Sequence, residues 1–211
     1  MNAVATGMPA GHVGARFGGV TTSRSLVGDA RCSRLLGEAL RQRPEATRQQ
    51  SGVDDLAEHR GGQPARSLWS AGGALEQDRL YADPEIARKL SVLVGLPVTP
   101  SGNRGSYSYY GGDGDFLGLH RDVNSCDLTL ITVLADPTAR DDPRGGLLAY
   151  PGRCGERLSS IRATPHDGAR VLKPPVGSSI LIAGGEVAHR VLPMPPGPER
   201  VVSVLCFEAH P

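Results

Sequence analysis

Residues 107–134, YSYYGGDGDFLGLHRDVNSCDLTLITVL, decide the fold class and carry the first chemical motif. The triplet His120-Arg121-Asp122 follows a turn rich in Gly and Asp and stands at the near end of a run that we predict as a β-strand. Residues two apart on a strand point to the same face, so His120 and Asp122 would meet at one point while Arg121 turns away. The pair would supply two of the three ligands of a facial metal site.

A third ligand is offered by His189 in the segment GGEVAHRVLP, and Arg200 follows eleven residues later in ERVVSVLCFE. Taken alone, a His-x-Asp or a single His is more often an ordinary surface or core feature than a metal site. The ordered set of a strand-borne His-x-Asp, a later His and a following Arg favours the metal site. Two His and one carboxylate suit non-haem Fe(II) and leave positions open on the metal.

Short apolar runs separated by Gly, Pro and Asp turns follow Pro97. They are YSYY, DLTLITVL, GGLLAYP, ARVLKP, GSSILIA, HRVLP and RVVSVLCFE. Closely spaced short strands without a helix-length pattern between them predict an antiparallel sandwich or barrel. With a metal triad built in, we expect a mainly β (α+β) fold whose core is a double-stranded β-helix of jelly-roll or cupin-like form.

The chain before this core has a different texture. Residues 1–24 predict a loose arm or an irregular first strand, and residues 25–43 predict a helix that ends before Pro44. Residues 44–67 are polar and broken by Gly and Pro, which predicts a loop. A second helix is expected to begin at Asp83-Pro84, with its apolar face formed by Ile86, Leu90, Leu93 and Val94.

The composition indicates one domain over residues 1–211, with 1–96 as a helical and irregular support region and 97–211 as the catalytic core. A chain of 211 residues with 39% hydrophobic content is long enough for one sizeable core. The net charge of +1, from 23 basic and 22 acidic residues, indicates no surface for nucleic acid. The sequence has no signal-peptide pattern and no run of eighteen apolar residues, so we expect a cytoplasmic protein without membrane contact.

The four cysteines are widely spaced and form no Cys-x-x-Cys pair. This spacing favours reduced thiols over a disulfide framework or a zinc site. Cys206 lies in an apolar strand and is expected to belong to the core.

The ordered motifs resemble the 2-oxoglutarate/Fe(II)-dependent dioxygenases, and within them the prolyl-hydroxylase-like branch. That pattern contains a Tyr, a Gly-rich turn, His-x-Asp, a strand after Gly-Gly, a distal His and an Arg. In this sequence those places are held by Tyr110, residues 111–114, His120 and Asp122, residues 145–148, His189 with Val191, and Arg200. The resemblance covers roughly residues 104–208, about half the chain.

The resemblance implies that His120, Asp122 and His189 bind Fe(II) and that 2-oxoglutarate and O₂ take the open positions. It further implies conversion of 2-oxoglutarate to succinate and CO₂ while a C–H bond of the substrate is oxidised. Halogenases of this superfamily replace the carboxylate with Ala or Gly, whereas Asp122 is present here. Hydroxylation or a related oxidation, such as desaturation or ring closure, is therefore expected.

Arg200 is the candidate for the far carboxylate of 2-oxoglutarate, because a guanidinium binds a carboxylate through two hydrogen bonds. Tyr110 is the candidate phenol donor to the same co-substrate, and Thr129 is a second candidate. Many relatives carry a Ser or Thr two or four residues beyond the Arg, but here those places are Val202 and Val204. The hydroxyl must then come from another part of the chain.

Substrate contacts are assigned with alternatives left open. Arg121 and Asn124 flank the metal motif and are candidates for reading a polar substrate, or they are plain surface residues. Trp69, the only tryptophan, is either an anchor of the N-terminal layer or a wall of the substrate pocket.

The first hypothesis is a dioxygenase that hydroxylates a small molecule, such as an amino acid or a biosynthetic intermediate. A second hypothesis keeps the enzyme class but takes a prolyl or other protein residue as substrate. A third, from another class, is a cupin-like protein that binds a metal or ligand without turnover, or a metalloenzyme that uses no keto acid. Arg200 separates them, because a binding module has no need of that cation. The identity of the substrate and the oligomeric state stay open.

Overall fold

A long antiparallel sheet curls back on itself at the centre of the structure, a computed structural model that describes residues 12–52, 58–112 and 114–210. Neighbouring strands follow the order β1-β10-β7-β12-β5-β3-β6-β11-β8-β9, while β2 pairs with β3 and β4 pairs with β12. The strands are β1 (Val20–Ser23), β2 (Thr47–Ser51), β3 (Arg66–Gly72), β4 (Val98–Pro100), β5 (Ser106–Tyr110), β6 (Phe116–His120), β7 (Leu128–Ala135), β8 (Leu147–Ala149), β9 (Arg170–Leu172), β10 (Ser179–Ile182), β11 (His189–Val191) and β12 (Arg200–Ala209).

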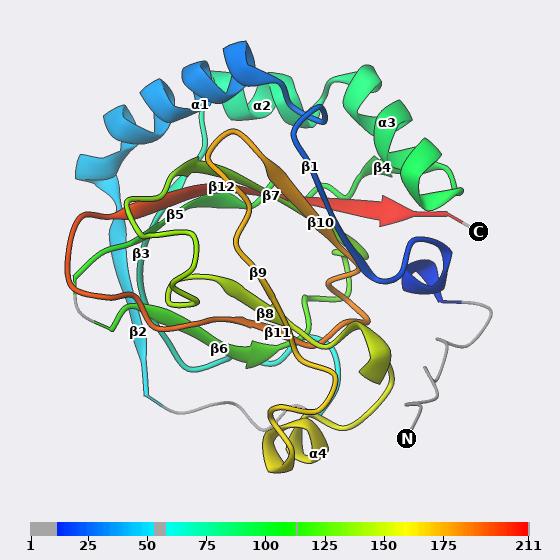
Figure 1. Ribbon diagram of the computed structural model, residues 1–211. Helices are drawn as coiled ribbons and strands as arrows, with labels where there is room; N and C mark the ends of the chain where they lie inside the picture. The colour runs from blue at the N-terminus through cyan, green and yellow to red at the C-terminus, as the bar shows by residue number, and fades with distance from the viewer. Residues whose placement is uncertain (1–11, 53–57, 113, 211) are drawn as a thin grey trace.

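The curl gives the sheet two facing layers (Figure 1). One layer holds β5, β12, β7 and β10, and the other holds β6, β11 and β8. This is the mainly β, double-stranded β-helix fold that the run of short strands predicted, and that prediction is confirmed. Every apolar run that the sequence marked as a strand after Pro97 forms one.

Helices cover the outer side of the first layer (Figure 1). They are α1 (Asp29–Gln42), α2 (Leu75–Tyr81) and α3 (Pro84–Val94), whereas the short α4 (Leu158–Ala163) lies beside the second layer. At the predicted start of α3, the Asp83 carboxylate accepts a hydrogen bond from the Glu85 amide at 2.8 Å. Gly95, with a φ of 70°, ends this helix in the left-handed conformation that glycine adopts without strain. Three short 3-10 helices, Val13–Arg16, Arg43–Glu45 and Pro151–Arg153, complete the helical structure of the described residues.

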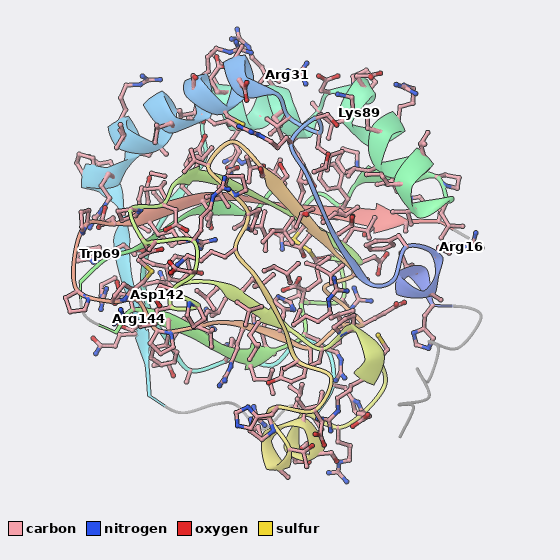
Figure 2. All side chains as sticks on the ribbon, in the orientation of Figure 1. Arg16, Arg31, Trp69, Lys89, Asp142 and Arg144 are labelled. Atoms are coloured by element: carbon pink, nitrogen blue, oxygen red, sulfur yellow. A yellow bond between two sulfur atoms is a disulfide. The ribbon has the colours of Figure 1, made fainter. Side chains whose placement is uncertain are left out.

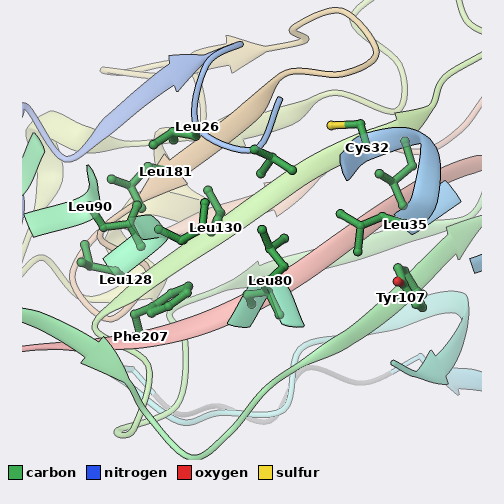
Figure 3. Packing of buried hydrophobic residues seen from close by; sticks show 14 of the residues in the cluster. Leu26, Cys32, Leu35, Leu80, Leu90, Tyr107, Leu128, Leu130, Leu181 and Phe207 are labelled. Atoms are coloured by element: carbon green, nitrogen blue, oxygen red, sulfur yellow. The ribbon is translucent and has the colours of Figure 1, made fainter. Parts of the chain in front are cut away.

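The main hydrophobic core lies between these helices and the first layer (Figure 3). Leu35 of α1, Leu80 of α2 and Leu90 of α3 pack there against strand residues such as Phe207. Each such buried side chain contributes about 1.5–3 kcal/mol. Leu93 was predicted on the buried face of α3, but it is 39% exposed, because the contact face is narrower than the apolar stripe. No helix among the described residues is long and apolar enough to cross a bilayer.

The N-terminal region contributes strands as well as helices. β1 pairs with β10 at one end of the sheet, and β3 lies between β5 and β6, where it joins the two layers. The prediction of a loop over residues 44–67 is therefore wrong at Thr47–Ser51, which forms β2. The sequence TRQQS has no apolar alternation because β2 is largely exposed and is held by its pairing with β3. Residues 1–11 of the predicted arm, residues 53–57 of the predicted loop and Asp113 of the Gly-rich turn lie outside the described residues.

Cys126 and Cys206 form a disulfide whose Cα atoms are 5.0 Å apart. The prediction of reduced thiols is wrong for this pair. Antiparallel pairing sets Cys206 of β12 opposite Thr129 of β7, and Cys126 lies only three residues before Thr129. Spacing along the chain does not reveal this proximity, because the two cysteines are 80 residues apart. Cys32 is buried in the main core.

Removal of this bridge is expected to destabilise the protein. The variant Cys126→Ala/Cys206→Ala should lose about 2–4 kcal/mol of unfolding free energy, because the bridge closes a long loop in the unfolded chain. Urea unfolding of the variant and the wild type measures the difference, and Cys154→Ala, which leaves the bridge in place, is the control. Thiol titration of unfolded, unreduced wild-type protein should count two of the four cysteines. A count of four would contradict the bridge.

Candidate metal centre

Two neighbouring strands and the segment that follows one of them bring the predicted metal ligands together. His120 is the last residue of β6 and His189 is the first residue of β11, and the two are direct partners in the pairing of these strands. Asp122 was predicted on a strand, but it lies just past the end of β6. Its amide donates a hydrogen bond to the Gly184 carbonyl at 2.8 Å, which fixes the backbone beyond β6 against the chain that follows β10.

The side chains of the three residues converge although only two of them are on strands. Nε2 of His120 lies 3.4 Å from Oδ1 of Asp122, and Nε2 of His189 lies 3.7 Å from the same oxygen. One potential ligand atom from each residue lies within 4.8 Å of the others. Two nitrogens and one oxygen at this spacing surround a point from which each could bind a single cation.

Both imidazoles are oriented by backbone carbonyls. Nδ1 of His120 donates to the Gly118 carbonyl at 2.9 Å, and Nδ1 of His189 donates to the Val187 carbonyl at 2.9 Å. A carbonyl only accepts, so in the neutral ring the proton sits on Nδ1 and the lone pair of Nε2 faces Asp122. This is the arrangement in which a histidine is prepared as a metal ligand.

The electrostatics of the triad fit the same role. Burial acts to raise the pKa of Asp122, but the two imidazoles and the Thr129 hydroxyl hold that pKa well below its usual range. Burial lowers the pKa of His189 to about 4, and His120 lowers it further while Asp122 opposes the shift. At neutral pH the site therefore holds a carboxylate beside a neutral His189, which are the protonation states that bind a metal.

The Asp122 carboxylate is held from its other side. The Thr129 hydroxyl donates to its Oδ2, so Thr129 orients the carboxylate rather than standing free for the co-substrate. Gly184 lies against the same oxygen, and a Cβ at this position would overlap Oδ2 of Asp122 and approach the Thr129 hydroxyl to 2.7 Å. Sequence reasoning missed Gly184, although the Gly-Gly pair at 184–185 directly after an apolar strand marks a close approach of backbone.

The triad lines a cavity of about 120 Å³ between the two layers. The first layer contributes polar side chains from β5 and β12, including Ser108, Tyr110 and Arg200. The facing layer contributes apolar side chains such as Leu147 and Val191 to the cavity lining. One buried cavity thus holds three metal-ligand candidates and a cation.

Arg200 begins β12 and is almost fully buried, with 3% of its side chain exposed. Its Nε donates to Oδ2 of Asp136 at 3.2 Å, and its guanidinium carbon lies 5.9 Å from the centre of the Tyr110 ring. Burial lowers the pKa of Arg200, and Asp136 opposes that shift. Sequence reasoning missed Asp136. The one signal for it was its position directly after the last residue of β7.

The sequence matches no protein-family model and no curated protein. Solved structures nevertheless match the fold over nearly the whole chain. The epimerase SnoN from nogalamycin biosynthesis, described as non-heme and alpha ketoglutarate dependent, has a TM-score of 0.68 and 16% identity over 93% of this chain and 79% of its own.

AviO1 from Streptomyces viridochromogenes Tue57 has a TM-score of 0.66 and 20% identity over 99% of this chain and 97% of its own. A Pseudomonas putida prolyl-4-hydroxylase has a TM-score of 0.57 and 17% identity over 92% of this chain and 94% of its own. The chain has the fold of the 2-oxoglutarate/Fe(II) oxygenases. The resemblance read from the motifs is therefore confirmed at the level of fold, and prolyl hydroxylases are among the structures that share it.

Within this oxygenase fold, the hydroxyls that are missing at positions 202 and 204 of β12 are present on the neighbouring strand β5. Val202 is the register partner of Ser108, and Val204 is the register partner of Ser106. Both serines line the cavity on the same wall as Arg200. The alternation in SYSYY indicates that these serines face the same side as Tyr110, because residues two apart on a strand share a face. Tyr107 and Tyr109 lie on the other face.

The three predicted substrate contacts lie elsewhere in the oxygenase fold. Arg121 is buried, and its guanidinium donates to the carbonyls of Glu186 at 2.8 Å and Glu156 at 2.6 Å, so it ties loops together. Asn124 is exposed on a turn beyond the metal motif. Trp69 of β3 is labelled in Figure 2. It packs against the main core, and the Arg43 guanidinium lies 4.7 Å from the centre of its ring. None of the three lines the cavity of the triad.

Gly184→Ala is expected to weaken metal binding by about 10- to 100-fold, the usual cost of displacing a ligand's support. The added methyl group would push the Asp122 carboxylate away from the two imidazoles. Calorimetric titration of the metal-free protein with Fe(II) under nitrogen measures the affinity. Gly152→Ala, which adds a methyl group with nothing within 4 Å, is the matched control. Equal affinities of Gly184→Ala and wild type would show that the close approach does not position Asp122.

Proposed function

We propose that the protein is an Fe(II)- and 2-oxoglutarate-dependent dioxygenase that hydroxylates an unactivated C–H bond of a small molecule. The observation that carries the proposal is that the His120, Asp122 and His189 ligand set and Arg200 line the same buried cavity. A keto acid with a second carboxylate needs both features, a metal at one end and a cation at the other. A cupin-like binder of a metal alone needs only the first.

His120, Asp122 and His189 would hold the Fe(II). Each side chain is already oriented by a hydrogen bond at its second polar atom, Nδ1 in the two histidines and Oδ2 in Asp122. When bound, Fe(II) would supply the redox chemistry that couples O₂ and 2-oxoglutarate to oxidation of the substrate, with succinate and CO₂ as the other products. The protein would contribute orientation and shielding of this chemistry from water.

Arg200 would bind the far carboxylate of 2-oxoglutarate. Its Nε donates to Asp136, and the Arg200 side chain lines the cavity, where its other N–H groups would donate to the carboxylate. Tyr110 is the register partner of Arg200 and lines the same wall. Burial raises the pKa of Tyr110 to about 12, so the phenol keeps its proton at neutral pH and would act as a hydrogen-bond donor to the co-substrate. Ser108 would supply the hydroxyl that relatives carry on the strand of the Arg.

A small-molecule substrate is favoured by the solved neighbours. SnoN, which has the highest TM-score of the three structures compared above, is known in complex with Fe3+, alpha ketoglutarate and nogalamycin RO. An amino acid or a natural-product intermediate is therefore the proposed substrate class. The likeness to a prolyl-4-hydroxylase supports the second candidate, hydroxylation of a prolyl residue in a peptide.

Anaerobic addition of Fe(II) and then 2-oxoglutarate to metal-free protein tests the proposal. We expect the visible charge-transfer band of a chelated keto acid in the wild type and its loss in His189→Ala. Release of succinate then screens free amino acids, natural-product intermediates and prolyl peptides as substrates. Bound metal without the band would contradict the dioxygenase and leave a cupin-like binder or another metalloenzyme.

A variant that lacks the Arg200 cation separates co-substrate binding from metal binding. Asp136→Asn/Arg200→Gln removes both charges of the buried pair, so no charge is left without its partner. We expect unchanged Fe(II) affinity and a loss of about 2–5 kcal/mol in 2-oxoglutarate binding, the cost of removing a buried charged partner. Arg88→Gln on the exposed face of α3 is the control. Undiminished 2-oxoglutarate affinity in the double variant would exclude Arg200 as its ligand.

A further inference from the structure

A second and larger hollow lies on the opposite face of the strands that carry the two histidines. This outer groove has a volume of about 540 Å³ and runs along β6 and β11 beside α4. Its apolar floor includes Leu119, Tyr150 and Ile161, which belong to a hydrophobic cluster separate from the two larger cores. A concave apolar site of this size is typical of small-molecule pockets.

Arg190 points into this groove because of its place on β11. Successive residues of a strand face opposite sides, so His189 faces the inner cavity and Arg190 faces the outer groove, while Val191 borders both. The Nε of Arg190 is buried and has no hydrogen-bond partner among the described residues. A guanidinium donor that is shielded from water and unpaired costs free energy until an acceptor reaches it.

The other polar side chains that line the groove are of basic residue types. Arg162 of α4 and His166 line it, and its lining contains no acidic residue among the described part of the chain. A cleft between α1 and α2 shows the contrast, since its arginines Arg31 and Arg34 pair with Asp83 and Glu76. Unlike these two arginines, Arg190 forms no ion pair with a carboxylate of the described residues.

We propose that the outer groove binds an organic acid with an apolar body. Its carboxylate would accept hydrogen bonds from Arg190, and its aromatic or branched aliphatic body would lie on Leu119 and Ile161. A carboxylate matches the guanidinium fork of Arg190 and carries a negative charge that no described residue of the groove lining supplies. The groove shares Leu117 and Val191 with the inner cavity but none of the metal-ligand candidates and not Arg200, so binding there would not require Fe(II) or 2-oxoglutarate.

Calorimetric titration of metal-free, full-length protein with 4-phenylbutyrate tests this site. We expect saturable binding to the wild type that is at least about tenfold weaker in Arg190→Gln, the loss of one charge-assisted contact. The neutral 4-phenylbutanamide should bind the wild type at least about tenfold more weakly than the acid, for the same reason. Arg88→Gln makes the same charge change outside the groove and should bind like the wild type. Thermal unfolding of each variant verifies that it is folded.

The inner cavity also contains a cation, so one further variant decides between the two sites. The acid should still bind Asp136→Asn/Arg200→Gln with wild-type affinity. Binding that is lost in this variant but kept in Arg190→Gln would place the acid in the inner cavity and overturn the proposal. Absence of saturable binding to the wild type, or equal binding of acid and amide, would overturn it as well.

Discussion

The antiparallel pairing of β6 with β11 is the constraint on which the candidate site depends. It sets His120 directly opposite His189, although 69 residues separate them in the chain. Because a shift of one residue would turn one of the imidazoles to the outer face, the register itself is part of the site. Asp122 joins the pair only because the backbone beyond β6 is tied to the Gly184 carbonyl.

Burying these polar groups costs free energy, and the surrounding fold offsets that cost. Each imidazole donates to a carbonyl, the Asp122 carboxylate accepts from Thr129, and Arg200 is paired with Asp136. The groups that remain available face one another across the inner cavity. The atoms that face the cavity are the ones for which we propose chemistry, and the other polar atoms of these side chains already have hydrogen-bond partners. These hydrogen bonds hold the side chains in place before any ligand binds. Arg190 departs from this pattern on the outer face, and a ligand is the missing partner that we assign to it.

The fold and the three metal-ligand candidates could be predicted from the sequence because both leave a pattern along the chain. Period-two apolar runs mark strands, and His-x-Asp with a distal His marks a ligand set. The disulfide and the roles of Asp136 and of the serines of β5 follow from which strands are neighbours in the sheet. A single sequence does not reveal that pairing. The strand β2 escaped prediction because an exposed hairpin needs no apolar face. The burial of Arg121 and its hydrogen bonds to the carbonyls of Glu156 and Glu186 could not be predicted, because its neighbours in sequence gave no indication of them.

The central claim is that His120, Asp122 and His189 form one metal centre, and a crystal grown with one equivalent of Fe(II) under nitrogen tests it most directly. Anomalous scattering at the iron edge locates the ion independently of any assumed chemistry. The account predicts a single strong peak bonded to Nε2 of both histidines and to the Asp122 carboxylate, with positions facing the inner cavity open. A peak at other residues, or an ion that contacts only one of the three, would contradict it.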